Sequence, residues 1–161
     1  MALSVGDKIP ATSFKQLGAD GMQDVSTADY CKGRKVALFA LPGAFTPTCS
    51  AQHVPSYVQN AAALKAKGIA AIGCVSVNDA FVMQAWGEAQ QVGDAVDMLA
   101  DGNGEFAQAT GLTLDGPGFG LGQRTGRFSM IVDDGTVTHL HVEENPGEMN
   151  VSSAERLLED L

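Results

Sequence analysis

Short apolar runs along this chain alternate with longer segments in which apolar residues recur at helical spacing. The runs at residues 35–41 and 69–77 are typical of strands buried on both faces of a sheet. Between them, residues 49–67 carry apolar positions at helical spacing and end in good helix formers and a glycine, which predicts a helix. The order of strand, helix and strand predicts a parallel βαβ unit.

The same alternation continues to the end of the chain. The expected elements are a helix over 80–92 capped by Asn78 or Asp79, a strand over 98–100, a helix over 104–110, a hairpin of strands 128–132 and 136–142 around an Asp-Gly turn, and a terminal helix capped by Ser152 or Ser153. Parallel units followed by a hairpin predict an α/β fold with a mixed central sheet flanked by helices, the outline of a thioredoxin-like fold. We expect one domain over residues 1–161.

Composition and charge narrow the classes of partner. The 161 residues are 45% hydrophobic and 18% charged, which is typical of a globular protein, and their net charge is −9. An acidic surface disfavours nucleic acid and anionic membranes as partners. Apolar runs long enough to span a bilayer are absent, and residues 1–7 lack the features of a signal peptide. We therefore expect a cytoplasmic protein, or an organellar one whose transit peptide has been removed.

Three cysteines, Cys31, Cys49 and Cys74, are candidates for thiol chemistry. An odd, small number does not suggest a disulfide scaffold, and the lack of a CxxC pair excludes a thioredoxin-type dithiol. Their spacing relative to the histidines is unlike that of a zinc site, so we expect no metal. The alternatives are one reactive thiol or three inert buried thiols.

Residues 41–50 favour the reactive thiol. This segment follows a buried strand and opens a helix, so Cys49 is expected in the first helical turn, where unpaired N–H groups and the helix dipole favour a thiolate. The hydroxyl of Thr46 can point at the same pocket, and Pro42 can shield the sulfur from water. Sulfur attack on a peroxide builds negative charge on the departing oxygen, which a fixed cation would stabilise. Arg127 and Arg124 are the candidate cations.

The spacing of Pro42, Thr46 and Cys49 (PxxxTxxC) resembles the active-site signature of peroxiredoxins. Longer matches resemble the type II, or peroxiredoxin-5, subfamily: PGAFTPTCS at 42–50, HVP at 53–55, CVSVNDAFV at 74–82, AWG at 85–87 and RFSM at 127–130. The resemblance extends from residue 5 to the final helix. It implies a thiol peroxidase for hydrogen peroxide and small alkyl hydroperoxides that serves antioxidant defence and redox homeostasis.

The resemblance also implies a role for each matching residue. Cys49 would be the peroxidatic cysteine, oxidised to sulfenic acid, while Thr46 orients the peroxide and Pro42 shields the sulfur. Arg127 would be the pocket arginine, and His53 would support the pocket by hydrogen bonding. No metal, flavin or haem would be needed. Type II members commonly form homodimers through the face near the active site.

The route back to the thiol depends on the other cysteines. Cys74 is a candidate resolving cysteine because plant type II relatives also have a second cysteine at this position. It lies in a buried strand, however, and would have to move to reach the helix start. Cys31 is expected to be inert. Some animal relatives carry a resolving cysteine in the C-terminal segment, and residues 148–153 of this chain hold none. The expected reductant is therefore external, glutathione or glutaredoxin more than thioredoxin.

Other interpretations compete with this one. The fold could serve a redox-sensing or holdase binding module in which Cys49 oxidises once, or a glutaredoxin-like reductase, which the missing CxxC disfavours. His139 and His141 are expected at the surface and not as ligands. The glycine-rich segment 116–122 lacks the Lys-Ser/Thr of a P-loop and is interpreted as a loop that delivers Arg127. Trp86, at helical spacing from Val82, is expected to have a packing role.

Overall fold

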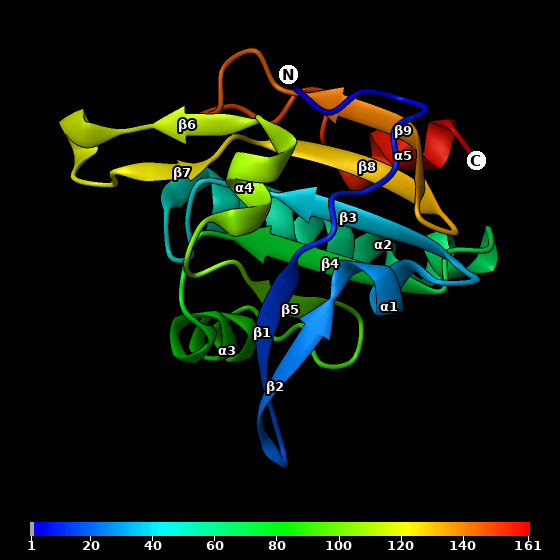
Figure 1. Ribbon diagram of the computed structural model, residues 1–161, viewed down its shortest axis with the longest axis horizontal. Coiled ribbons are helices and arrows are strands. Elements are labelled where there is room, and N and C mark those ends of the chain that lie inside the picture. Colours follow the sequence, from blue (N-terminus) through cyan, green and yellow to red (C-terminus); the bar gives the residue numbers. More distant parts are fainter. Residues whose placement is uncertain (1) are drawn as a thin grey trace.

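The computed structural model describes residues 2–161. Its main feature is a seven-stranded mixed sheet with helices on both faces (Figure 1). The strand order is β2-β1-β5-β4-β3-β8-β9, in which β3, β4 and β5 are parallel and β8 is antiparallel to β3. The strands are β1 (Ser13–Gly18), β2 (Gly21–Ser26), β3 (Lys35–Ala40), β4 (Ala71–Ser76), β5 (Asp97–Ala100), β8 (Phe128–Asp133) and β9 (Thr136–Val142). The expected α/β thioredoxin-like fold is confirmed.

The helices divide between two hydrophobic clusters, one on each face of the sheet. They are α1 (Thr27–Cys31), α2 (Val54–Ala66), α3 (Ala80–Ala89), α4 (Glu105–Thr110) and α5 (Ala154–Glu159). Alternate residues of β3 point to opposite faces: Ala37 and Phe39 pack in the cluster with α2, α3 and α5, whereas Val36 and Leu38 pack in the cluster with α1 and α4. Among residues 2–161, every helix is too short or too polar to cross a membrane.

The predicted capping and turn residues lie at the observed helix starts and at the β8–β9 turn. Asp79 accepts a hydrogen bond from the N–H of Val82 at 2.8 Å and starts α3, which ends at Ala89, three residues earlier than expected. Ser153 caps α5, while the hydroxyl of Ser152 is used elsewhere. At the β8–β9 turn Asp134 and Gly135 both have positive φ, which an Asp-Gly pair tolerates in a tight hairpin.

Several elements of the fold were not predicted from the hydrophobic periodicity of the sequence. The β1–β2 hairpin and the small sheet of β6 (Thr113–Asp115) and β7 (Gln123–Thr125) are polar and largely exposed, with Phe14 the one fully buried residue of β1 and β2. Such strands lack the apolar periodicity on which the prediction depends. The helix expected from residue 49 also differs, because Cys49–His53 form a π-helical turn ahead of α2.

Candidate active site

Cys49 lies where the loop after β3 becomes helical. Pro47 and Thr48 already have helical conformation, and the N–H of Ser50 bonds the carbonyl of Thr46 at 3.0 Å, so Cys49 belongs to the first turn, as expected. Its side chain is fully buried at the C-terminal end of the parallel strands. In the first turn of a helix, the unpaired N–H groups and the helix dipole favour an anion.

Arg127 is brought to Cys49 by the sheet. It directly precedes β8, and because Phe128 pairs with Ala40 of the antiparallel neighbour β3, it lies beside the end of β3 where the cysteine loop begins. Its Nη2 donates to Cys49 Sγ at 3.1 Å, and the residue is only 2% exposed. Its Nε donates to the carbonyl of Pro146 at 2.9 Å, which orients the guanidinium.

His53 completes the support of that guanidinium. Arg127 Nη1 lies 2.9 Å from His53 Nδ1, and since a guanidinium only donates, Nδ1 accepts and Nε2 carries the proton. Nε2 then donates to the carbonyl of Ser152 at 3.0 Å. Burial, together with the nearby Arg127 charge, lowers the pKa of His53 to about 3, although the bond to Ser152 opposes the shift. The ring is therefore neutral at physiological pH.

Thr46 and Pro42 line an open cavity of about 420 Å³ in front of Arg127. Thr46 Oγ1 donates to the carbonyl of Gly43 at 2.7 Å, and this hydrogen bond lies within the loop that precedes Cys49. The exposed surface of the other walls is mainly apolar and includes Pro47, Leu114, Phe119, Leu121 and Pro146, while Thr48, Asp115 and Asn145 are polar lining residues. The cavity brings together three of the residues that the sequence singled out: Pro42, Thr46 and Arg127.

Arg124 holds the loop and makes no hydrogen bond to the sulfur. Its Nη1 donates to the carbonyl of Pro42 at 3.2 Å and its Nε to that of Leu121 at 2.9 Å. A Cβ at Gly43 would come within 2.9 Å of this Nη1, so a larger residue there would displace the end of the Arg124 side chain. The glycine-rich segment 116–122 forms the tip of the β6–β7 hairpin and so positions Arg124. The interpretation that it delivers Arg127 is corrected, because the sheet pairing of β8 does so.

The other two cysteines are free and buried on different faces of the sheet. Cys74 lies in β4, fully buried, where burial and the neighbouring Cys49 raise its pKa well above the usual value, against the effect of Arg127. Cys31 ends α1 in the opposite cluster, and burial raises its pKa to about 11 despite Arg34. None of the three cysteines lines the cavity in front of Arg127, and Cys49 differs from the other two in accepting a hydrogen bond from Arg127.

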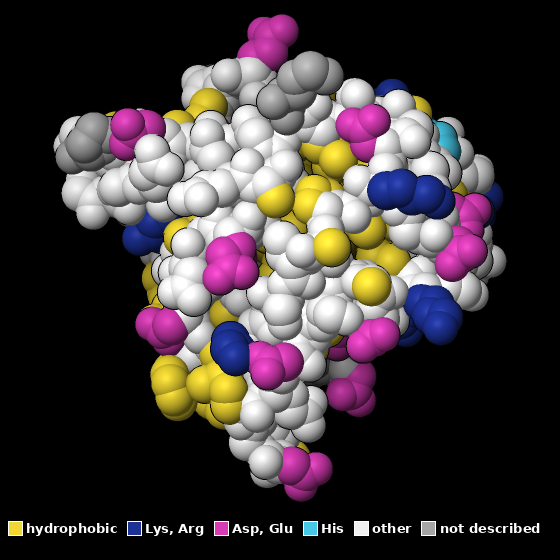
Figure 2. Space-filling view, in the orientation of Figure 1, with side chains coloured by type: hydrophobic (Ala, Val, Ile, Leu, Met, Phe, Trp, Pro, Cys, Tyr) yellow, Lys and Arg dark blue, Asp and Glu magenta, His cyan; other side chains and the backbone are white. Residues whose placement is uncertain are grey.

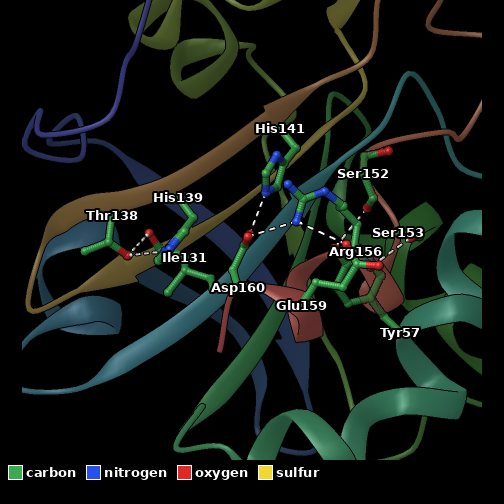
Figure 3. A network of polar contacts seen from close by, with 10 residues as sticks. All are labelled: Tyr57, Ile131, Thr138, His139, His141, Ser152, Ser153, Arg156, Glu159 and Asp160. Atoms are coloured by element: carbon green, nitrogen blue, oxygen red, sulfur yellow. Dashed lines mark hydrogen bonds and ion pairs between the residues drawn. The ribbon is translucent and has the colours of Figure 1, made fainter.

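The histidines of β9 are less exposed than expected. His139 and His141 are both half-buried. His141 Nε2 lies 2.6 Å from Asp160 Oδ2, and Arg156 binds the other oxygen of that carboxylate (Figure 3). Within residues 2–161, no group of three or more His, Cys, Asp or Glu side chains is placed to hold a metal ion.

Sequence reasoning missed the groups behind His53. Tyr57 Oη donates to the same Ser152 carbonyl that His53 binds, at 3.0 Å, and its ring stacks on Phe39 at 3.9 Å. Ser152 is held in turn by Glu143. A backbone carbonyl has no sequence signature, and the pattern offered no signal for Glu143.

Comparison with known proteins identifies the family. The model of the Redoxin family matches residues 4–158. The chain is 48% identical over 164 residues to chloroplastic peroxiredoxin-2E-2 of Oryza sativa subsp. japonica, covering 99% of this chain and 72% of that protein. It is 47% identical over 160 residues to peroxiredoxin-2D of Arabidopsis thaliana, covering 99% and 98%. The chain belongs to the type II peroxiredoxins.

A solved structure supports the same assignment. Reduced Prx3 of Vibrio vulnificus, in complex with hydrogen peroxide, superposes with a TM-score of 0.93 at 48% identity and 98% coverage of both chains. As a peroxiredoxin, this protein is an antioxidant thiol peroxidase that reduces peroxide with a cysteine. The interpretation as a peroxiredoxin-5-like enzyme is confirmed.

Proposed function

We propose that Cys49 is the peroxidatic cysteine of this peroxiredoxin. The thiolate attacks the terminal oxygen of the hydroperoxide, an S–O bond forms, and the O–O bond breaks. Sulfur loses two electrons to become sulfenic acid, and the departing alkoxide or hydroxide takes up a proton to leave as alcohol or water. The observation that carries this proposal is the 3.1 Å hydrogen bond from Arg127 Nη2 to Cys49 Sγ. A fixed cation at this place stabilises both the thiolate and the charge that develops on oxygen.

The remaining residues have supporting roles in the proposal. Thr46 orients the peroxide through its hydroxyl, Pro42 shields the sulfur, and His53 holds Arg127. The cavity of about 420 Å³, with apolar walls and an open side, is compatible with hydrogen peroxide and small alkyl hydroperoxides. The roles form one arrangement, because each side chain contacts either the cavity or the guanidinium.

The reductant is proposed to be an external thiol, glutathione or glutaredoxin in preference to thioredoxin. Cys31 lies on the other face of the sheet from Cys49. Cys74 shares the cluster of Cys49, but it is paired on both sides within the sheet, so a disulfide with Cys49 would require β4 to move. A first thiol displaces water from the sulfenic acid and forms a mixed disulfide. A second thiol then releases Cys49 and the oxidised reductant as a disulfide.

A homodimer is proposed from exposed aromatic side chains near Cys49. Phe45 is 58% exposed in the cysteine loop and Phe81 is 64% exposed on α3. Exposed aromatic groups of this size favour an interface. Phe45→Glu and Phe81→Glu should lower the sedimentation coefficient to that of a monomer, whereas Val5→Glu should leave it unchanged.

Two further parts of the assignment remain proposals. We infer one domain over residues 1–161, supported by a single sheet that carries both hydrophobic clusters; residue 1 lies outside the described residues. We also infer a cytoplasmic or reducing organellar location, supported by three cysteines that all remain free thiols.

The decisive experiment compares three cysteine variants. Cys49→Ser should abolish catalytic consumption of hydrogen peroxide with glutathione and glutaredoxin present. Cys31→Ser and Cys74→Ser should each retain turnover, and each serves as a matched control for loss of one buried thiol. Turnover by Cys49→Ser would overturn the assignment, and loss of turnover in Cys74→Ser would make Cys74 the resolving cysteine.

A further inference from the structure

A carboxylate with no part in the chemistry described so far is buried behind the active site. Glu143 directly follows β9 and is 7% exposed. Its Oε2 accepts hydrogen bonds from the N–H groups of Asn150, Val151 and Ser152 at 2.9, 2.8 and 2.8 Å, and from the Ser152 hydroxyl at 2.6 Å. Within residues 2–161 it forms no ion pair.

The four donors keep this carboxylate ionised. Burial by itself raises the pKa of Glu143, but the bonds from the Ser152 hydroxyl and the three N–H groups outweigh it and hold the pKa below the ordinary value. Four donors converging on one oxygen suit a full negative charge better than a neutral amide oxygen. The negative charge of Glu143 therefore strengthens the hydrogen bonds that hold the segment from Asn150 to Ser152.

The loop that Glu143 closes, residues 143–152, presents its carbonyls to the active site. The carbonyl of Ser152 accepts from His53 Nε2 and Tyr57 Oη, as Figure 3 shows for Tyr57. The carbonyl of Pro146 accepts from Arg127 Nε, and that of Gly147 from the hydroxyl of Thr48 at 2.7 Å. One loop thus orients the guanidinium, the imidazole behind it and the turn that carries Cys49.

We propose that Glu143 is a positioning residue for the peroxidase reaction, acting through Ser152 and His53 on Arg127. Ser152 N and Oγ bind Glu143, and Ser152 O selects the tautomer of His53 that is protonated at Nε2. Only that tautomer offers a lone pair at Nδ1 to Arg127 Nη1. The proposal rests on the roles proposed above for Cys49 and Arg127.

Loss of the charge at Glu143 has a defined consequence along this chain of contacts. A displaced Ser152 carbonyl no longer holds the proton of His53 on Nε2, and a proton on Nδ1 would face an N–H of Arg127. The guanidinium would then lose the orientation that serves the peroxide. Misplacement of a reacting geometry by about 1 Å costs on the order of 100-fold in rate.

The test compares Glu143→Gln with Glu144→Gln, which makes the same change at the exposed neighbouring residue. For each fully reduced protein, quenched-flow mass spectrometry measures the rate constants of Cys49 with hydrogen peroxide and with iodoacetamide. Alkylation needs the thiolate but no oriented peroxide oxygen. Glu143→Gln should lower the ratio of the peroxide to the alkylation rate constant by about 10- to 100-fold. A purely structural role would lower the melting temperature and leave this ratio unchanged.

Arg127→Lys, measured alongside, distinguishes failure of the proposed active site from failure of the positioning role of Glu143. If Arg127→Lys reacts with peroxide as fast as the parent protein, the proposed active site fails and the role of Glu143 fails with it. If Arg127→Lys is slow but Glu143→Gln keeps the ratio of Glu144→Gln, only the positioning role is overturned. If Glu143→Gln does not fold, Ser152→Ala replaces it, because this variant removes one of the four donors and keeps the carbonyl. A lower ratio of the peroxide to the alkylation rate constant would support the positioning role, and an unchanged ratio would overturn it.

Discussion

Nη1 of Arg127 and Nδ1 of His53 lie 2.9 Å apart in the buried active site, a contact that only a neutral imidazole can make with a guanidinium. Protonation of His53 would place two cations in contact without water between them. The histidine of this peroxiredoxin is therefore a hydrogen-bond acceptor that steers an arginine, and not a proton donor to the peroxide. This contact makes protein stability depend on pH in a particular direction.

Stability should fall as the pH is lowered from about 6.5 toward 3 through His53. Burial and Arg127 lower the pKa of His53 from 6.5 to about 3, so in this window the unfolded chain binds a proton that the folded chain does not. One such group contributes a slope of up to about 1.4 kcal/mol per pH unit to the free energy of unfolding. Denaturant titrations at several pH values should show a shallower slope for His53→Asn. Parallel curves for the two proteins would contradict the assignment.

Replacement of Arg127 by lysine should slow oxidation of Cys49 by about 100- to 1,000-fold, the usual effect of losing one donor to a developing oxyanion. Lysine keeps the charge, but one ammonium group cannot bind Cys49 Sγ, His53 Nδ1 and the Pro146 carbonyl as the guanidinium does. Arg124→Lys is the matched control. It should have the smaller effect, because Arg124 binds carbonyls of the loop and not the sulfur. Stopped-flow kinetics with hydrogen peroxide measure both variants. A larger loss of rate in Arg124→Lys than in Arg127→Lys would contradict the prediction.

Cys31 should react slowly with disulfide reagents in the folded protein. It is 1% exposed, and burial raises its pKa to about 11, so at pH 8 only about one molecule in a thousand carries the thiolate. We expect labelling by Ellman's reagent to be more than about 100-fold slower than that of free cysteine. A slow phase that disappears in Cys31→Ser identifies the residue. Rapid labelling of Cys31 in the native state would refute the expectation.

Asp160 should stabilise the protein through its contacts with His141 and Arg156. Burial raises the pKa of Asp160, but the bonds from these two side chains outweigh it and lower the net value. The stabilisation is thus complete above the unfolded pKa and is lost as the pH falls through the lower folded pKa. At pH 7, Asp160→Asn should cost about 1 kcal/mol of unfolding free energy. Glu159 is a largely exposed partner of Arg156, so Glu159→Gln should cost less. Equal costs for the two variants would argue against a stabilising role of the half-buried Asp160 contacts.

Local sequence was enough to predict the elements that build the core. Apolar runs located β3 and β4, helical spacing and Asp79 located α3, and an Asp-Gly pair located the β8–β9 turn. These features depend on neighbours a few residues apart, so they are visible in the linear pattern. The polar hairpin of β1 and β2 was missed because its stability comes from pairing with the sheet and not from its own periodicity.

For the active site, the sequence by itself determined the cysteine and its immediate surroundings. The spacing of Pro42, Thr46 and Cys49 depends only on one strand-to-helix loop, whose geometry follows from a few local dihedrals. Residues alone left Arg124 and Arg127 as alternatives, and the choice came from a family resemblance. Only the tertiary structure shows the contact itself, because the pairing of β8 with β3 brings Arg127 to the sulfur of a residue 78 positions away. It also decided that Glu143 lies behind His53, since burial and backbone carbonyls are properties of packing and not of the chain.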